Sequence, residues 1–175
     1  MTYDPAHHIL TVHVENKAGV LSRVAGLFSR RGFNIESLAV GPTERPNVSR
    51  ITLRVDCAQE SIEQIEKQMH KLVNVLRVNE LEPGEAIERE LALLKVNAPA
   101  DRRGELLALA EVFNARVADL GPNAIIFEVV GSPEELDSFE ELVRPHGLKE
   151  LARTGRIGLA RASTARAPRR QHVLR

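Results

Sequence analysis

The sequence predicts an α+β protein built from two ferredoxin-like halves, each with the element order β-α-β-β-α-β. Two observations support this fold class. Segments with strand-type and helix-type hydrophobic periodicity follow one another in that order twice along the 175 residues. The dipeptide Pro83-Gly84 separates the two runs. We therefore expect a first domain at residues 8–82, a second at residues 85–160, and a disordered basic tail at residues 161–175.

The first half opens with a strand, because residues 9–14 are mostly β-branched or apolar. A turn at residues 15–19 leads into a helix with apolar residues at helical spacing. Gly32 should end this helix, since glycine adopts the left-handed conformation found at helix C-termini. Further strands are expected at residues 33–40, 48–55 and 73–81, a proline-containing loop that is hard to pair at residues 41–47, and a second helix around residues 62–72.

The second half contains the strongest helix-start signal of the chain. Ser132 is a good N-cap, Pro133 suits the first helical position, and Glu135 completes a capping box. The other elements of this half are strands at residues 91–96, 117–120, 124–130 and 148–154, with an extension to residue 160, and a helix around residues 106–113.

The composition argues against several classes of function. Basic and acidic residues balance at 24 each, and with five Phe, one Tyr and no Trp the chain does not resemble a nucleic-acid-binding protein. A single cysteine excludes an internal disulfide. We find neither an apolar run of membrane-spanning length nor a signal-peptide pattern, and we therefore expect a cytoplasmic protein that does not enter a membrane.

The sequence contains no pattern that indicates catalysis or metal binding. Its six histidines do not show metal-ligand spacing, and we expect the adjacent pair His7-His8 to lie in solvent. Cys57 has no histidine-based constellation near it and is interpreted as a packed small residue. Nucleotide-binding and nucleophile motifs are missing as well. We assign no catalytic residue, metal ligand or cofactor to this chain.

One segment has the chemistry of a binding site, namely the turn between the first strand and the first helix. A helix N-terminus offers unpaired N–H groups and partial positive charge to a carboxylate. Gly19 would allow close approach to that backbone, and Asn16 offers a hydrogen-bond donor and an acceptor, as an amino-acid ligand requires. From spacing alone the alternative stays open that Asn16 caps the helix and that Gly19 and Asn34 are turn residues.

Three stretches resemble the small, regulatory subunit of acetohydroxyacid synthase, also called acetolactate synthase. VENKAGVLSRVAGLFSRRGFNIESL (residues 14–38) and IEQIEKQMHKLVNVLRV (residues 62–78) are similar to its N-terminal ACT domain. ERELALLKV (residues 88–96) is similar to the start of its second domain. The resemblance covers about residues 8–160 and is more specific in the first half than in the second.

The resemblance implies a non-catalytic subunit that binds and activates a large catalytic subunit, which uses thiamine diphosphate, Mg²⁺ and FAD. It also implies feedback inhibition by a branched-chain amino acid, usually valine, in valine, leucine and isoleucine synthesis. Members of the family pair through their ACT domains, and the effector lies at the junction of the pair. By position, one chain would contribute Asn16, Ala18, Gly19, Val20 and Leu21, and the other chain Asn34 and Ile35.

Two further expectations concern contacts with other chains. We expect a homodimer in which an edge strand near residues 9–14 extends the sheet, and we expect Glu44 and Arg45 of the 41–47 loop to contact the catalytic subunit. The order β-α-β-β-α-β also occurs in RNA-recognition modules and acylphosphatases, but the aromatics of the first and the glycine-rich loop with an arginine of the second are missing. The alternative that remains is an amino-acid sensor that acts without this partner.

Overall fold

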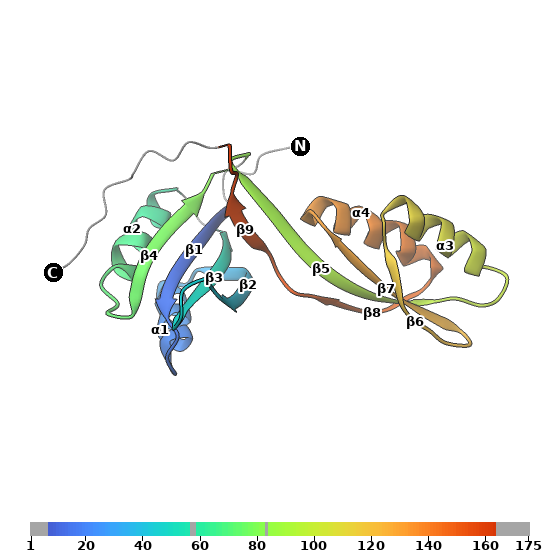
Figure 1. The fold of residues 1–175 in the computed structure, drawn as a ribbon, viewed down its shortest axis with the longest axis horizontal. Helices are drawn as coiled ribbons and strands as arrows, with labels where there is room; N and C mark the ends of the chain where they lie inside the picture. The colour runs from blue at the N-terminus through green and yellow to red at the C-terminus, as the bar shows by residue number, and fades with distance from the viewer. Residues whose placement is uncertain (1–6, 57–58, 83, 164–175) are drawn as a thin grey trace.

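The computed structural model describes residues 7–56, 59–82 and 84–163. These residues form two antiparallel sheets, and each sheet has two helices packed on one of its faces (Figure 1). The predicted pair of βαββαβ halves is confirmed. Pro83 and Cys57 lie outside the described residues, as do residues 164–175 of the predicted tail.

The first sheet has the strand order β2-β3-β1-β4. Its first strand is therefore central, pairing with β3 on one side and β4 on the other, and the two edge strands are β2 and β4. The expectation that residues 9–14 form a sheet edge is wrong, because this topology inserts the first strand between the third and the fourth. The elements are β1 (His7–Glu15), α1 (Val20–Arg31), β2 (Asn34–Pro42), β3 (Val48–Asp56), α2 (Gln59–Met69) and β4 (Val75–Leu81).

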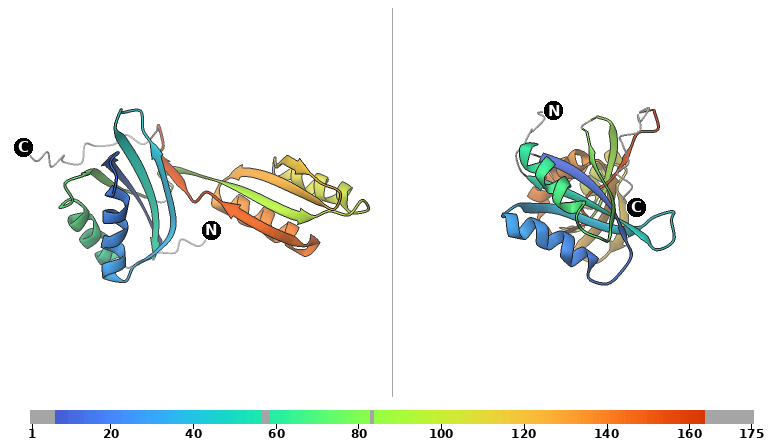
Figure 2. Two further views of the ribbon diagram at one scale, coloured as in Figure 1. Left: turned by 90° about the horizontal axis from the view of Figure 1, so that it is seen from below. Right: turned by 90° about the vertical axis from the view of Figure 1, so that its left-hand side faces the viewer.

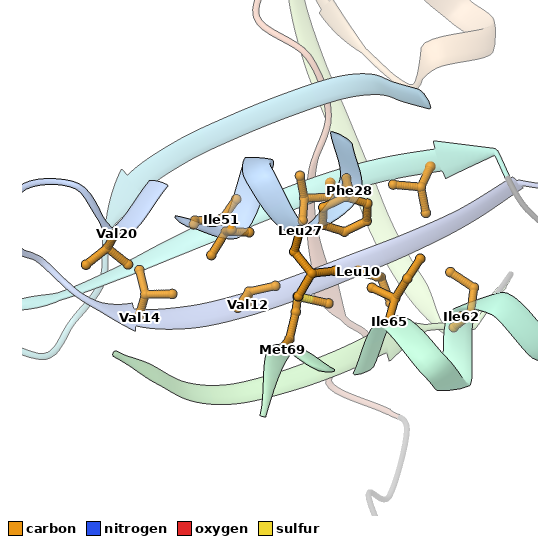
Figure 3. Close-up of a cluster of buried hydrophobic side chains, with 13 residues drawn as sticks. Leu10, Val12, Val14, Val20, Leu27, Phe28, Ile51, Ile62, Ile65 and Met69 are labelled. Atoms are coloured by element: carbon orange, nitrogen blue, oxygen red, sulfur yellow. The ribbon is translucent and has the colours of Figure 1, made fainter. Parts of the chain in front are cut away.

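The core of the first half lies between its sheet and its two helices (Figure 3). Alternate residues of β1 and β3 point toward the helices, as the two-residue period of a strand requires. Gly32 ends α1 with a φ of 71°, and its N–H donates to the carbonyls of Phe28 and Ser29, which confirms the predicted stop signal. The fully or nearly fully buried residues here include Leu10, Val12, Val14, Val24, Phe28, Ile51, Leu53, Ile62, Ile65 and Met69.

The second sheet has the order β6-β7-β5-β8, and β9 pairs separately with the first part of β5. The capping box before α4 is present: Ser132 Oγ accepts from the Glu135 N–H at 3.3 Å, and Glu135 accepts from the Ser132 N–H at 2.6 Å. The elements are β5 (Ala86–Asn97), α3 (Arg103–Val112), β6 (Arg116–Leu120), β7 (Ala124–Gly131), α4 (Pro133–Val143), the short 3-10 helix Arg144–His146, β8 (Leu148–Arg153) and β9 (Ile157–Ala160).

The segment between β8 and β9 joins the two halves of the molecule (Figure 2). The main-chain N–H of Arg156 donates to Ser37 Oγ of β2 at 2.8 Å. Two residues later, in β9, the Gly158 carbonyl accepts from Arg50 of β3 at 3.3 Å. Gly158 also lies so close to Leu81 of β4 that a Cβ atom there would come within 2.6 Å of Leu81 Cδ1. This connection therefore contacts strands on both sides of β1.

Three local expectations need correction. Pro42 is paired within β2 rather than in a loop, which an edge strand tolerates because its outward side needs no N–H donor. His8 is buried rather than solvated, and its Nδ1 lies 2.6 Å from the Glu80 carboxylate. Arg161, which we assigned to the tail, is held in place: its N–H donates to the Glu85 carbonyl at 2.8 Å and its Nε to the Gly84 carbonyl at 2.9 Å.

Candidate functional site

The predicted binding turn connects the end of β1 at Glu15 to the start of α1 at Val20. Gly19 occupies the N-cap position with a φ of 80°, a left-handed conformation that a residue with a Cβ adopts only at a cost. The alternative that Asn16 caps this helix is wrong, because the cap position is three residues further on and no side chain caps it. The requirement for glycine at this turn is therefore a backbone requirement.

The turn leaves its backbone accessible. Asn16, Ala18 and Gly19 are exposed, and nothing lies within 4 Å of the position where a Gly19 Cβ would be. Val20 is buried in the core and fixes the start of α1, whereas Leu21 is 40% exposed. The first N–H groups of a helix have no partners within the helix, and here the Val20 N–H makes a long hydrogen bond of 3.4 Å to the Lys17 carbonyl before it. An open helix N-terminus next to an exposed leucine can accept a small molecule that carries a carboxylate and an apolar side chain.

The remaining two predicted residues lie at the other end of α1. Asn34 begins β2 opposite Asp56 and is exposed, and Ile35 packs on the core. The 12 residues of α1 separate this end from Gly19, which at 1.5 Å per residue is about 18 Å. A single chain brings Asn16, Ala18, Gly19, Val20 and Leu21 together but does not bring Asn34 and Ile35 to them.

A polar network surrounds the turn, and the sequence analysis missed its most connected residue, Asn74. This residue lies directly before β4, and its amide joins the side chains of Glu15 and Arg23. The Asn74 amide, and after it the Lys17 ammonium at 3.0 Å, hold the pKa of the Glu15 carboxyl below its usual value. Sequence spacing gives no signal for this contact, because Asn74 lies 59 residues after Glu15.

The predicted partner-contact loop is short and internally bonded. Thr43 Oγ1 donates to the Val48 carbonyl at 3.1 Å and accepts from the Arg45 N–H at 3.2 Å. Glu44 and Arg45 are both exposed, and the Arg45 Nε lies 3.8 Å from the Glu44 Oε1. A hollow of about 260 Å³ lies beside the loop, between its first residues and β9; it is lined by Pro42, Thr43, Glu44, Arg50 and Leu159.

A second charged cluster, which we call the junction cluster, lies where the two halves meet. Glu90 is only 6% exposed and accepts from Arg153 at 2.7 Å and from Arg156 at 3.2 Å. Burial would lower the pKa of Arg153, but its hydrogen bond to Asp137 and the charge of Glu90 raise it above the usual value. The junction cluster borders a hollow of about 360 Å³ that also includes Glu36 and Arg54, a second ion pair at 2.9 Å.

The described part of the chain has no helix that is both long enough and apolar enough to cross a membrane.

Comparisons with known proteins identify the protein family of each half of the chain. Residues 10–77 match the family model for the AHAS small subunit-like ACT domain, so the first half is an ACT domain. Residues 89–162 match the model for the small subunit of acetolactate synthase.

Relatives match over nearly their whole length. A probable acetolactate synthase small subunit of Archaeoglobus fulgidus is 47% identical over 156 residues, which is 89% of this chain and 98% of the relative. The acetolactate synthase small subunit of Mycolicibacterium smegmatis is 44% identical, over 88% of this chain and 91% of the relative. The crystal structure of the small subunit from Thermotoga maritima superposes with a TM-score of 0.83 at 39% identity, covering 89% of this chain and 97% of the other. The chain belongs to the family of acetolactate synthase small subunits.

Proposed function

We propose that this chain is the non-catalytic regulatory subunit of an acetolactate synthase. In this proposal it binds and activates a cytoplasmic catalytic subunit that carries thiamine diphosphate, Mg²⁺ and FAD, and it makes that enzyme sensitive to a branched-chain amino acid, for which we propose valine. The observation that carries the proposal is the exposed turn at Gly19, with a φ of 80° and an open helix N-terminus, in a chain of this family.

The effector chemistry follows from the groups at the turn. The carboxylate of the amino acid would meet the N–H groups between Gly19 and Leu21 at the positive end of α1. Asn16, beside them, would bind the polar end, and the half-exposed Leu21 would contact the side chain. Asn34 and Ile35 would come from a second chain, because about 18 Å of helix separates them from the turn within one chain.

The test is a reconstitution with the catalytic subunit. The full chain should co-purify with it, raise its rate of acetolactate formation, and make that rate fall as valine is added. A chain that binds valine but neither co-purifies with the catalytic subunit nor changes its rate would instead be a sensor for another partner.

Dimerisation is expected through β2, not through β1. β2 is an edge strand, and its residues Leu38 and Val40 are 37% and 49% exposed beside α1. A second β2 would continue the sheet and bury these side chains. Light scattering at micromolar concentration should show a dimer, and Val40→Lys should shift it toward the monomer by placing a charge at the sheet edge.

The control for this prediction is Val130→Lys. Val130 is 58% exposed but lies on β7 in the second sheet, which has β6 on its outer side. This variant should remain dimeric. A wild-type chain that scatters as a stable monomer would contradict the prediction.

The loop residues Glu44 and Arg45 are expected to matter for activation only. Both are exposed in a loop stiffened by the two hydrogen bonds of Thr43, and a stiff loop loses less entropy when it docks. The Glu44→Ala/Arg45→Ala variant should activate the catalytic subunit less, with unchanged valine binding by calorimetry. The double variant Glu63→Ala/Lys67→Ala is a matched control, since it removes another exposed ion pair, from α2. Equal activation by both variants would assign the partner contact to another surface.

A further inference from the structure

Asn74 contacts both sides of the candidate effector turn from a distant part of the sequence. Its side-chain Nδ2 donates to the Glu15 carboxylate at 2.6 Å, and its Oδ1 accepts from an Arg23 guanidinium N–H at 2.7 Å. Its main-chain carbonyl accepts from the Glu15 N–H at 2.9 Å. One residue therefore makes three hydrogen bonds to the two flanks of the turn.

An amide side chain at position 74 suits the hydrogen-bonding chemistry of both partners, Glu15 and Arg23. A carboxylate only accepts hydrogen bonds and a guanidinium only donates them, whereas an amide does both. Aspartate at position 74 would repel Glu15, and alanine would leave both partners without this bond. The orientation of the amide is thus determined by its neighbours.

The two partners of Asn74 lie on either side of the residues that would meet the effector. Glu15 is the last residue of β1, and Arg23 follows Gly19 by one helical turn, with its main-chain N–H donating to the Gly19 carbonyl at 3.1 Å. Holding both flanks fixes the path of the four residues between β1 and α1. On the β3 side, regular pairing of β1 reaches Glu15, and the Asn16 N–H donates to the Asn47 carbonyl at 2.8 Å. On the β4 side, the pairing of β1 is interrupted between His13 and Val14, just before the turn, and Asn74 makes its hydrogen bonds on this side.

We propose that Asn74 is a positioning residue of the effector site. It holds the turn in the conformation that presents the first N–H groups of α1 to the carboxylate of the effector, and so reduces the ordering that binding would otherwise require. This inference rests on the effector site proposed above.

The first experiment compares valine binding by the full chain and its variants. In calorimetry, Asn74→Ala and Asn74→Asp should each raise the dissociation constant for valine about three- to tenfold, the effect of losing hydrogen bonds to charged partners near the surface. Asn79→Asp is the matched control, because Asn79 lies in β4, the strand that follows Asn74, and its Oδ1 accepts from Arg77 Nε at 2.9 Å, away from the turn. Its valine affinity should not change.

Two further measurements separate positioning from general damage. Without valine, an NMR titration of the Glu15 carboxyl should show a higher pKa in Asn74→Ala than in the wild type, because Lys17 is then the main group that still stabilises the carboxylate. The double variant Glu15→Gln/Asn74→Asp exchanges donor and acceptor, and it should recover most of the lost valine affinity, since the aspartate can still accept from Arg23.

The outcomes distinguish this inference from the proposed function. A wild-type chain that binds valine while the Asn74 variants bind it equally well would overturn the role of Asn74 alone. An unchanged Glu15 pKa in Asn74→Ala, or an exchange variant as weak as Asn74→Asp, would overturn it as well. A wild-type chain that does not bind valine would overturn the effector site itself and this inference with it.

Discussion

Replacement of Gly19 by aspartate is expected to abolish inhibition by valine while most of the activation of the catalytic subunit remains. The new carboxylate would occupy the place of the ligand carboxylate at the N-terminus of α1, where nothing lies within 4 Å of the added Cβ. It would satisfy the same N–H groups and repel the ligand. Activation should remain because Glu44 and Arg45, the proposed contact with the catalytic subunit, lie in the 43–47 loop. This loop neighbours the turn through the Asn16 N–H, which donates to the Asn47 carbonyl at 2.8 Å, and Gly19 is not part of that hydrogen bond.

The expected size of the effect follows from the size of the ligand. Valine has about eight non-hydrogen atoms, and an intermediate efficiency gives about 6 kcal/mol of binding free energy, or a dissociation constant on the order of tens of micromolar. Loss of the carboxylate contact should remove measurable binding in calorimetry. Because one methylene changes specificity by only about 1–3 kcal/mol, leucine and isoleucine should bind the wild-type site too.

Gly84→Asp is a close control for this variant. Gly84 has the same φ of 80° and also has nothing within 4 Å of an added Cβ, so the backbone strain and the added charge are alike. It lies between β4 and β5, away from the turn. Gly84→Asp should keep valine inhibition. Wild-type sensitivity in Gly19→Asp would place the effector elsewhere.

Local sequence signals predicted most of the secondary structure. The capping box at Ser132 and Glu135 and the stop at Gly32 each depend on neighbours within a few residues, and the structure contains both. The turn at Gly19 was recognisable for the same reason, since its strand, turn and helix are continuous in sequence. Features that arise from a short segment can be read from that segment.

Pairing across the chain could not be predicted in this way. A central strand such as β1 and an edge strand show a similar alternation of apolar and polar residues. Only the order of the strands in the sheet shows that β1 is central. β5 begins at Ala86 rather than at residue 91, because its first four residues pair with β9 more than 60 residues later. His8 is buried beside Glu80 of the neighbouring β4, whose carboxylate lies 2.6 Å from the His8 Nδ1. Asn74 joins the candidate site for the same kind of reason.

Glu90 in the junction cluster should be the most sensitive single charge for stability. Its carboxylate is 6% exposed and lies between Arg153 and Arg156, whose side chains are 26% and 15% exposed. Glu90→Gln keeps the shape but removes the charge, and it turns an N–H group toward a guanidinium that can only donate. Breaking a buried ion pair costs about 3–5 kcal/mol, and the partial exposure of the arginines places this variant near the lower end.

The measurement is thermal unfolding of the full chain, where a loss of about 3 kcal/mol should lower the midpoint by roughly 6–12 °C. Glu128→Gln is the control, since Glu128 binds Arg116 at 2.8 Å on the same sheet but that arginine is 74% exposed, and such surface pairs contribute at most about 1 kcal/mol. The same change of charge should therefore have a several-fold larger effect at residue 90 than at residue 128. Equal, small shifts in both variants would mean that solvent screens the junction cluster as well. Because Arg156 also donates its main-chain N–H to Ser37, Glu90→Gln should loosen the contact of the second half with β2 before either sheet unfolds.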